Sequence, residues 1–170
     1  VPRHWPRNHS WATIPQSARL FTTEPGTQLL GLCHWQTKPV EAPTLVLIHG
    51  LEGSANSHYM QGIARKAYGA GFNVVRMNQR TCGGTDHLCP GLYNSGLSSD
   101  YRMIVHQLAT QDQLRTIWLV GYSMGGNLAL KAAGELGESD TALKGVAAVS
   151  PTIDPTQCVA MLEQPRNRLY

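Results

Sequence analysis

Two continuous apolar runs, each followed directly by a glycine-containing turn, constrain the fold of this chain more than any other feature. Residues 44–48 (TLVLI) and 116–120 (TIWLV) show no alternation of polar and apolar side chains. This pattern is typical of strands that are buried on both faces of a parallel sheet. Residues 146–149 form a third such run, and segments of helical composition separate the runs. The order predicts the α/β class, with a mostly parallel sheet covered by helices on both faces.

Turn signals and periodicity predict the remaining elements. Two partly alternating runs flank a Glu-Pro-Gly-Thr turn at 24–27, and we interpret them as an antiparallel pair of strands near the amino end. Ser98 or Ser99 is expected to cap a helix. The predicted elements are strands at 19–23, 28–36 and 72–77, helices at 57–69, 98–111, 124–136 and 155–163, and a long loop at 78–93.

The ends of the chain and its organisation are less regular. Residues 1–16 show no period, so we expect an irregular arm that packs through Trp5 and Trp11. The chain contains no repeat and no internal linker. Residues 1–170 are therefore interpreted as the amino-terminal part of a single domain.

Composition excludes several classes of protein. The 170 residues are 42% apolar and 15% charged, and no apolar run approaches the length of a membrane-spanning helix. The net charge of +3 comes from scattered residues, which favours a solvated surface over a nucleic-acid interface. Because the first residues contain no apolar signal core, we expect a cytoplasmic protein in which Cys82 and Cys89 stay reduced.

The motif Gly-Tyr-Ser-Met-Gly-Gly at 121–126 lies directly after a predicted strand and directly before a predicted helix. A serine on such a tight turn has a strained backbone, and its hydroxyl projects at the edge of the sheet. Gly121 and Gly125 lack the side chains that would collide with the neighbouring strand and helix. The helix that follows directs its amino-terminal dipole at the same point. Ser123 is therefore the predicted nucleophile; the alternative is a serine that only caps the helix.

A second glycine motif, His-Gly-Leu-Glu-Gly-Ser at 49–54, follows the first buried run at the same edge of the sheet. Gly50 and Gly53 allow the backbone to turn its amides toward a ligand. Acyl transfer needs two amide donors that face the oxyanion, one after the nucleophile and one from a loop of this kind. These donors are predicted to be Met124 and Leu51.

Other polar and aromatic side chains beside these motifs have less specific roles. His49 could be a general base, but its place beside the strand favours a role in bracing the loop. We interpret Glu52 as a surface or loop-bonding carboxylate. Tyr122 flanks the nucleophile, and either an acyl-pocket role or simple packing explains it.

The loop at 78–93 contains side chains of the types that bind metal ions. Cys82, His87 and Cys89 lack a fourth ligand and match no common spacing, so we expect no metal. Arg80 follows a buried strand and is interpreted as a structural hydrogen-bonding residue.

Taken in order, four segments resemble the YheT-like branch of the α/β-hydrolase superfamily, the type 4 esterases. They are the two glycine motifs, Asn-Gln-Arg-Thr-Cys-Gly-Gly at 78–84, and Leu-Tyr-Asn-Ser-Gly at 92–96 with Asp100. The resemblance implies the α/β-hydrolase fold and a serine hydrolase that acts on small-molecule carboxylic esters, lipid-like ones included, without metal or organic cofactor. Thr81 departs from the pattern, because the family usually has glycine there.

A base for Ser123 is missing from this sequence. The order along the chain in this fold is Ser, then Asp or Glu, then His, and no histidine follows Ser123. Asp154 is a candidate acid, although the acid and histidine of the resembled family come from later strands and loops. We therefore expect an amino-terminal half that stops before the cap and the last core strands, and that is nearly inactive alone.

This expectation has a structural consequence and leaves alternatives open. The strand at 146–149 would have an exposed edge that pairs with the missing half or with another chain, so that the isolated chain oligomerises. One alternative is a non-catalytic binding or scaffold protein with a hydrolase-like fold. Another is an acyltransferase that uses the same site.

Overall fold

A six-stranded sheet forms the centre of the computed structural model, which describes residues 14–139 and 141–167. The strand order is β1-β2-β4-β3-β5-β6, and the last four strands in this order are parallel to one another. The antiparallel β1 and β2 extend the sheet on the β4 side. The strands are β1 Ser17–Glu24, β2 Thr27–His34, β3 Thr44–Ile48, β4 Asn73–Met77, β5 Ile117–Tyr122 and β6 Leu143–Val149.

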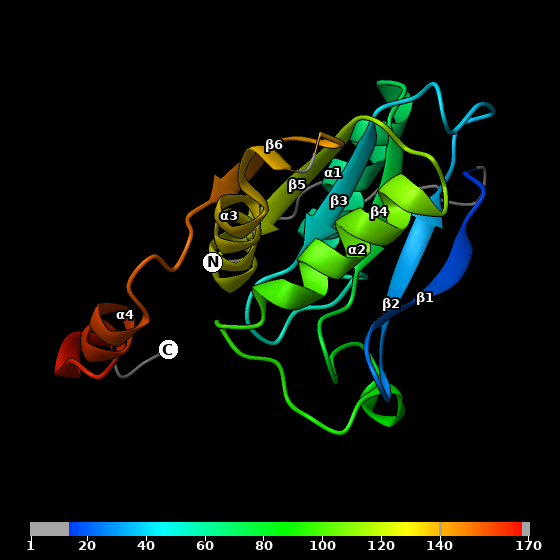
Figure 1. The fold of residues 1–170 in the computed structure, drawn as a ribbon. Helices are drawn as coiled ribbons and strands as arrows, with labels where there is room; N and C mark the ends of the chain where they lie inside the picture. Colours follow the sequence, from blue (N-terminus) through cyan, green and yellow to red (C-terminus); the bar gives the residue numbers. More distant parts are fainter. Residues whose placement is uncertain (1–13, 140, 168–170) are drawn as a thin grey trace.

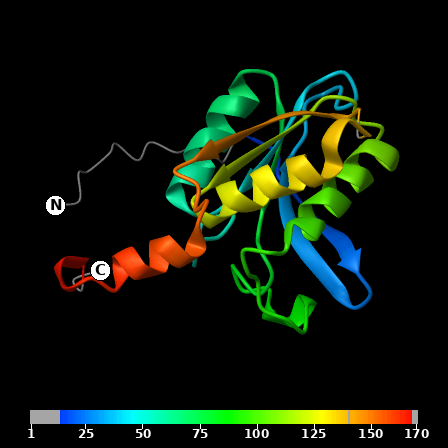
Figure 2. The same cartoon turned by 60° about the vertical axis from the view of Figure 1, so that its left-hand side comes forward.

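Helices cover both faces of this sheet. Helices α2 and α3 pack on one face and α1 packs on the other, as Figures 1 and 2 show. The α-helices are α1 His58–Gly69, α2 Ser98–Thr110, α3 Met124–Leu136 and α4 Pro155–Leu162. Short 3-10 helices are η2 Asp86–Leu88, η3 Gly137–Ser139 and η4 Pro165–Asn167. The predicted α/β class and the antiparallel amino-terminal pair are therefore confirmed.

Two of the predictions need comment. The expected serine cap of α2 is wrong: Leu97 occupies the N-cap position and no side chain caps the helix. The Ser98 hydroxyl instead donates to Glu135 on α3, at 2.7 Å, because the two helices pack side by side. The predicted arm with Trp5 and Trp11 lies largely outside the described residues.

An apolar core lies on each side of the sheet, where side chains of the strands pack against side chains of the helices. Tyr101, Ile104 and Leu108 of α2 pack with Leu128 of α3 on one side. Met60 of α1 belongs to the smaller cluster on the other side. Since β3 and β4 are buried between the two layers, the loops that follow their carboxyl ends have fixed starting points.

Helix α4 differs from the other helices. None of its residues is buried, and it lies apart from the sheet in both ribbon views (Figures 1 and 2). It follows β6, the last strand of the sheet, which pairs with β5. The carboxyl-terminal side of the described chain therefore presents both a strand edge and an uncovered helix.

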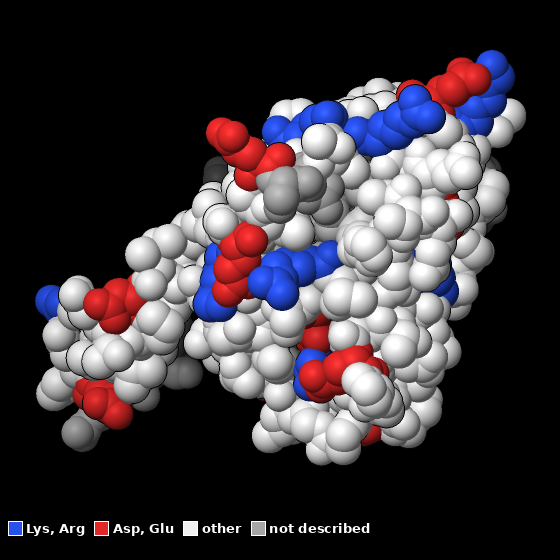
Figure 3. Space-filling view, in the orientation of Figure 1, with Lys and Arg blue, Asp and Glu red and all other residues white. Residues whose placement is uncertain are grey.

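The surface charge is mixed. On the face shown in Figure 3, Lys and Arg side chains lie beside Asp and Glu. Glu135, for example, forms ion pairs with Lys131 and Arg102. The described helices include none with the length and apolar character needed to cross a bilayer.

Thr81, the departure from the family pattern, has a φ of 60°. A β-branched side chain is strained in this left-handed region, whereas glycine enters it freely. We expect Thr81→Gly to raise the free energy of unfolding by about 1 kcal/mol, since relief of the strain exceeds the added chain entropy. Urea unfolding measures this change. As a control, Thr110→Gly at the end of α2 should lower stability by about 0.5 kcal/mol, and equal losses for both variants would contradict the argument.

Candidate active site

Ser123 occupies the turn between β5 and α3. Its φ and ψ are 51° and −121°, a conformation that residues with a side chain rarely adopt. Four backbone hydrogen bonds hold it there, and in the two shortest its N–H donates to Val149 O and its carbonyl accepts from Gly126 N–H, both at 2.9 Å. The side chain is exposed. The hydroxyl thus projects at the carboxyl edge of the sheet, directly before the first turn of α3.

The glycines on either side of Ser123 are required by close backbone contacts. A Cβ atom on Gly121 would lie 2.1 Å from the carbonyl oxygen of Gly125. A Cβ atom on Gly125 would lie 2.3 Å from the carbonyl oxygen of His49. No side chain fits at these distances, so the sequence pattern reflects the contact of α3 with the end of β3.

The loop that follows β3 lies against Ser123. A Cβ atom on Gly50 would lie 3.1 Å from Ser123 Cβ and 3.8 Å from its Oγ. Gly53 is equally confined, because a Cβ atom there would lie 2.9 Å from the imidazole of His49. The two glycine motifs, separated by about seventy residues in the sequence, therefore meet at one point.

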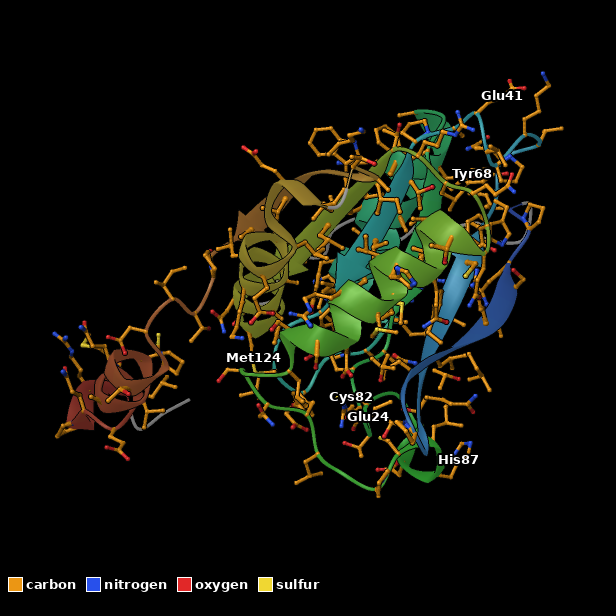
Figure 4. The ribbon with its side chains drawn as sticks, viewed as in Figure 1. Glu24, Glu41, Tyr68, Cys82, His87 and Met124 are labelled. Carbon is orange, nitrogen blue, oxygen red and sulfur yellow. The ribbon has the colours of Figure 1, made fainter. Side chains whose placement is uncertain are left out.

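The two predicted amide donors have no acceptor in the described part of the chain. Met124 is the first residue of α3, where an amide has no partner within the helix. Leu51 lies at the exposed turn of the loop, and its N–H also has no hydrogen-bond acceptor among the described residues. Both N–H groups remain available to an oxyanion. Figure 4 shows Met124 on the same side of the molecule as Cys82, which follows β4.

His49 is completely buried and uses both ring nitrogens inside the protein. Nδ1–H donates to Gly50 O at 2.7 Å, and Nε2 accepts from Gln79 N–H at 3.1 Å. These bonds assign the neutral Nδ1–H tautomer, and burial lowers the pKa of His49. The ring is thus placed to brace the loop, and neither nitrogen is available to take a proton from Ser123.

The loop at 78–93 is held by buried ionic and polar contacts. The Arg80 guanidinium donates to both oxygens of Asp100, at 2.7 and 2.8 Å, and to Glu24 at 2.6 Å. Arg80 therefore has the structural role predicted for it. Its partner Asp100 is also buried, in the first turn of α2.

The cysteines of this loop form no disulfide within the described residues. Cys82 and Cys89 are buried and free, whereas His87 is exposed on η2 (Figure 4). The described residues contain no cluster of three His, Cys, Asp or Glu side chains that could hold a metal ion.

Two further candidates have visible local roles. Tyr122 packs its ring against Tyr59 of α1, with centroids 4.8 Å apart. Asp154 is exposed and caps α4 by accepting from Gln157 N–H at 3.0 Å. Neither contact tests their predicted roles in the site.

Sequence reasoning missed two tyrosines. The hydroxyl of Tyr59 accepts from Gly50 N–H at 3.1 Å, and that of Tyr93 accepts from Glu52 N–H at 2.9 Å. Tyr93 belongs to the Leu-Tyr-Asn-Ser-Gly segment that carries part of the family resemblance. The segment indicates that Tyr93 has a role, but it does not indicate which residue Tyr93 contacts. Tyr59 lies on an ordinary helical face and gave no signal.

Two substitutions on α3, Gly125→Ala and Gly134→Ala, test whether the backbone at Gly125 is as confined as the structure indicates. Gly125→Ala should lower the free energy of unfolding by more than about 3 kcal/mol or prevent folding, because the Cβ atom would collide with carbonyl oxygens. Gly134→Ala on the same helix meets nothing within 4 Å. It should stabilise the protein by about 0.5–1 kcal/mol. Urea unfolding of the two variants compares them, and tolerance of Gly125→Ala would refute this packing.

Buried neutral histidines predict how stability depends on pH. Burial lowers the pKa of both His34 and His49, so the unfolded chain binds more protons than the folded one once the pH falls below about 6.5. The stability that these two neutral rings contribute is fully present above that pH. It should decrease toward pH 5, by up to about 1.4 kcal/mol per pH unit for each histidine.

Denaturant unfolding between pH 7.5 and 5 measures this slope. His49→Gln should reduce the slope, whereas His58→Gln, at an exposed position on α1, should leave it unchanged. A flat profile for the unsubstituted protein would show that these rings are not held neutral.

Known proteins share this fold and these motifs. Residues 43–169 match the alpha/beta hydrolase fold family. The candidate esterase YheT of Escherichia coli (strain K12) is 31% identical over 139 residues, which is 80% of this chain and 41% of that protein. Phospholipase ABHD3 of Homo sapiens is 29% identical over 75% of this chain and 31% of that protein. The chain thus spans less than half the length of these relatives.

A solved structure agrees at the level of the fold. An esterase of Pyrococcus furiosus superposes with a TM-score of 0.70 at 23% identity, over 86% of this chain and 55% of that one. The similarity to YheT also confirms the resemblance stated from the motifs. Because the family match covers most of its length, this chain belongs to the alpha/beta hydrolase fold family.

Proposed function

We propose that this chain carries the nucleophile and the oxyanion loop of a serine hydrolase that cleaves carboxylic esters. The observation that supports this most is the exposed Ser123, with φ of 51° before the first turn of α3 and with the Gly50 backbone against its Cβ atom. The relatives named above carry the names of ester hydrolases. They favour an ester of lipid-like character as the substrate.

The chemistry follows from the groups at the site. Ser123 Oγ attacks the ester carbonyl carbon as a base removes its proton, and the carbonyl oxygen becomes negatively charged. The N–H groups of Leu51 and Met124 donate to this oxygen. The carbon–oxygen bond to the alcohol then breaks, and the base returns the proton to the leaving alcohol. Water repeats these steps on the acyl-enzyme and releases the carboxylic acid.

The base and its orienting acid are proposed to come from outside residues 1–170. No histidine follows Ser123 in this sequence, and both nitrogens of His49 are engaged. The family order of Ser, acid and His favours partners that come later than α4. Residues 1–170 alone would then turn over substrate on the order of 10⁶ times more slowly than the complete site. Asp154 remains a weaker candidate for the acid, since it caps α4.

The same polypeptide would cover the open side of the sheet. The outer edge of β6 and the fully exposed helix α4 follow one another at the carboxyl-terminal side of the described chain (Figure 1). Val159, Met161 and Leu162 are exposed apolar residues on that helix. We propose that further hydrolase polypeptide, or another chain, packs there.

The nucleophile is tested in the complete gene product. A fluorophosphonate probe should label Ser123, as shown by mass spectrometry of the labelled peptide. Ser123→Ala should abolish labelling and lower ester hydrolysis by at least about 10⁴-fold. Ser99→Ala, at an exposed position on α2, is the matched control and should retain both. Labelling at another serine, with activity retained in Ser123→Ala, would exclude the proposal.

A further inference from the structure

The amides of the loop after β3 are almost all engaged. From Gly50 to Ser57, each N–H except that of Leu51 donates to an acceptor inside the protein. Beyond Glu52, most acceptors are oxygen atoms of the same loop, in local turns. The exception is the side-chain oxygen of Asn78, which accepts from Ala55 N–H at 2.7 Å. Within residues 50–57, the single amide that has no acceptor in the described part of the chain is therefore the one proposed to face the oxyanion.

Two tyrosine hydroxyls engage the amides on either side of Leu51. Tyr59 of α1 accepts from Gly50 N–H at 3.1 Å, and its ring packs on Tyr122, the residue before the nucleophile. The same tyrosine thus contacts both the oxyanion loop and the turn that holds Ser123. A change in its position would alter the spacing between these two parts of the site.

Tyr93 engages the other side through one residue. Its hydroxyl accepts from Glu52 N–H at 2.9 Å and donates to Glu52 Oε1 at 2.8 Å. Glu52 has a φ of 54°, an uncommon conformation for a residue with a side chain. Its backbone therefore needs support from its surroundings, and the tyrosine provides a bond to both its amide and its carboxylate. Burial raises the pKa of Tyr93 to about 12, so the hydroxyl keeps its proton at neutral pH.

We propose that Tyr59 and Tyr93 are positioning residues that fix the orientation of the Leu51 N–H by holding the amides before and after it. The inference rests on the proposed function, in which Leu51 donates to the oxyanion. The two peptide planes that contain the bonded amides flank the peptide plane of Leu51. With both neighbours held, the plane between them has little freedom to rotate, and its N–H, which has no acceptor in the described part of the chain, keeps one direction. The loop then supplies one donor of fixed direction without reorganisation during the reaction.

A third tyrosine, Tyr68, serves as the control for Tyr59 and Tyr93. Tyr68, also on α1, donates its hydroxyl to Trp35 O at 3.3 Å. This bond lies at the other end of the helix, away from Met124 and the site, as Figure 4 shows. Each Tyr→Phe substitution removes one hydroxyl and leaves the ring, so the three variants lose similar hydrogen bonds at different places.

The experiment compares Tyr59→Phe, Tyr93→Phe and Tyr68→Phe in the complete gene product. Each is assayed with an oxygen ester and with the thionoester of the same acid and alcohol. We expect kcat for the oxygen ester to fall about 10- to 100-fold in Tyr59→Phe and Tyr93→Phe, with KM changed by less than about twofold. Tyr68→Phe should retain the kcat of the unsubstituted enzyme.

The thionoester reports on the oxyanion contact specifically. Sulfur is a weak hydrogen-bond acceptor, so a thionoester gains little from an oriented amide donor. The ratio of kcat/KM for the ester to that for the thionoester should therefore fall in Tyr59→Phe and Tyr93→Phe, but not in Tyr68→Phe. A general loss of folding would lower both rates together and leave this ratio unchanged.

The outcomes distinguish this inference from the proposed function. Activity that survives in Ser123→Ala would overturn the proposed function and this inference with it. If Ser123→Ala is inactive and the Tyr59 and Tyr93 variants behave like Tyr68→Phe, the proposed function stands and the positioning role is refuted. An unchanged ester-to-thionoester ratio refutes it in the same way, even where kcat falls.

Discussion

The contact between the first turn of α3 and the end of β3 is the constraint on which the rest of the site depends. Gly125 lies so close to the carbonyl oxygens of Ile48 and His49 that no side chain fits between them. This approach brings the turn at Ser123 beside the loop that begins at Gly50. If α3 were moved out by the width of one methyl group, the nucleophile and the proposed oxyanion donor would no longer face the same carbonyl.

Buried polar groups hold the loops at this edge. His49 and Gln79 bond to one another across the ends of β3 and β4, and Arg80 pairs with Asp100 below them. Each of these side chains is at least nine-tenths buried and bonds to a partner inside the protein, although Gln79 Oε1 has no hydrogen-bond partner. A charged pair in such a place adds little stability by itself, but the loss of one partner is costly. The network therefore restricts the loops to one arrangement.

The sequence predicted the regular elements well because their signals are local. Strand β3 and helix α3 have the predicted bounds, since a continuous apolar run and a glycine-bounded helix depend on nearby residues only. The pairing of β2 with β4 and the hydroxyl contacts of Tyr59 and Tyr93 join residues far apart in the chain. No periodicity encodes such contacts. The predicted capping role of Ser98 was wrong for the same reason, because its hydroxyl donates to a carboxylate on α3 that is distant in the sequence.

Backbone strain gathers at the edge where the site forms. After each of the four parallel strands, a residue with a side chain adopts positive φ: Glu52, Thr81, Ser123 and Ser150. A strand that ends at this edge must turn abruptly if its amides and side chains are to face a common point, and strained conformations allow such turns. The buried strands and the helices packed on them stabilise the domain enough to tolerate the strain. At the amino edge one described residue with a side chain has a positive φ, Gln113, which lies before β5. Four of the five described residues that combine a side chain with a positive φ thus lie at the edge that carries the proposed site.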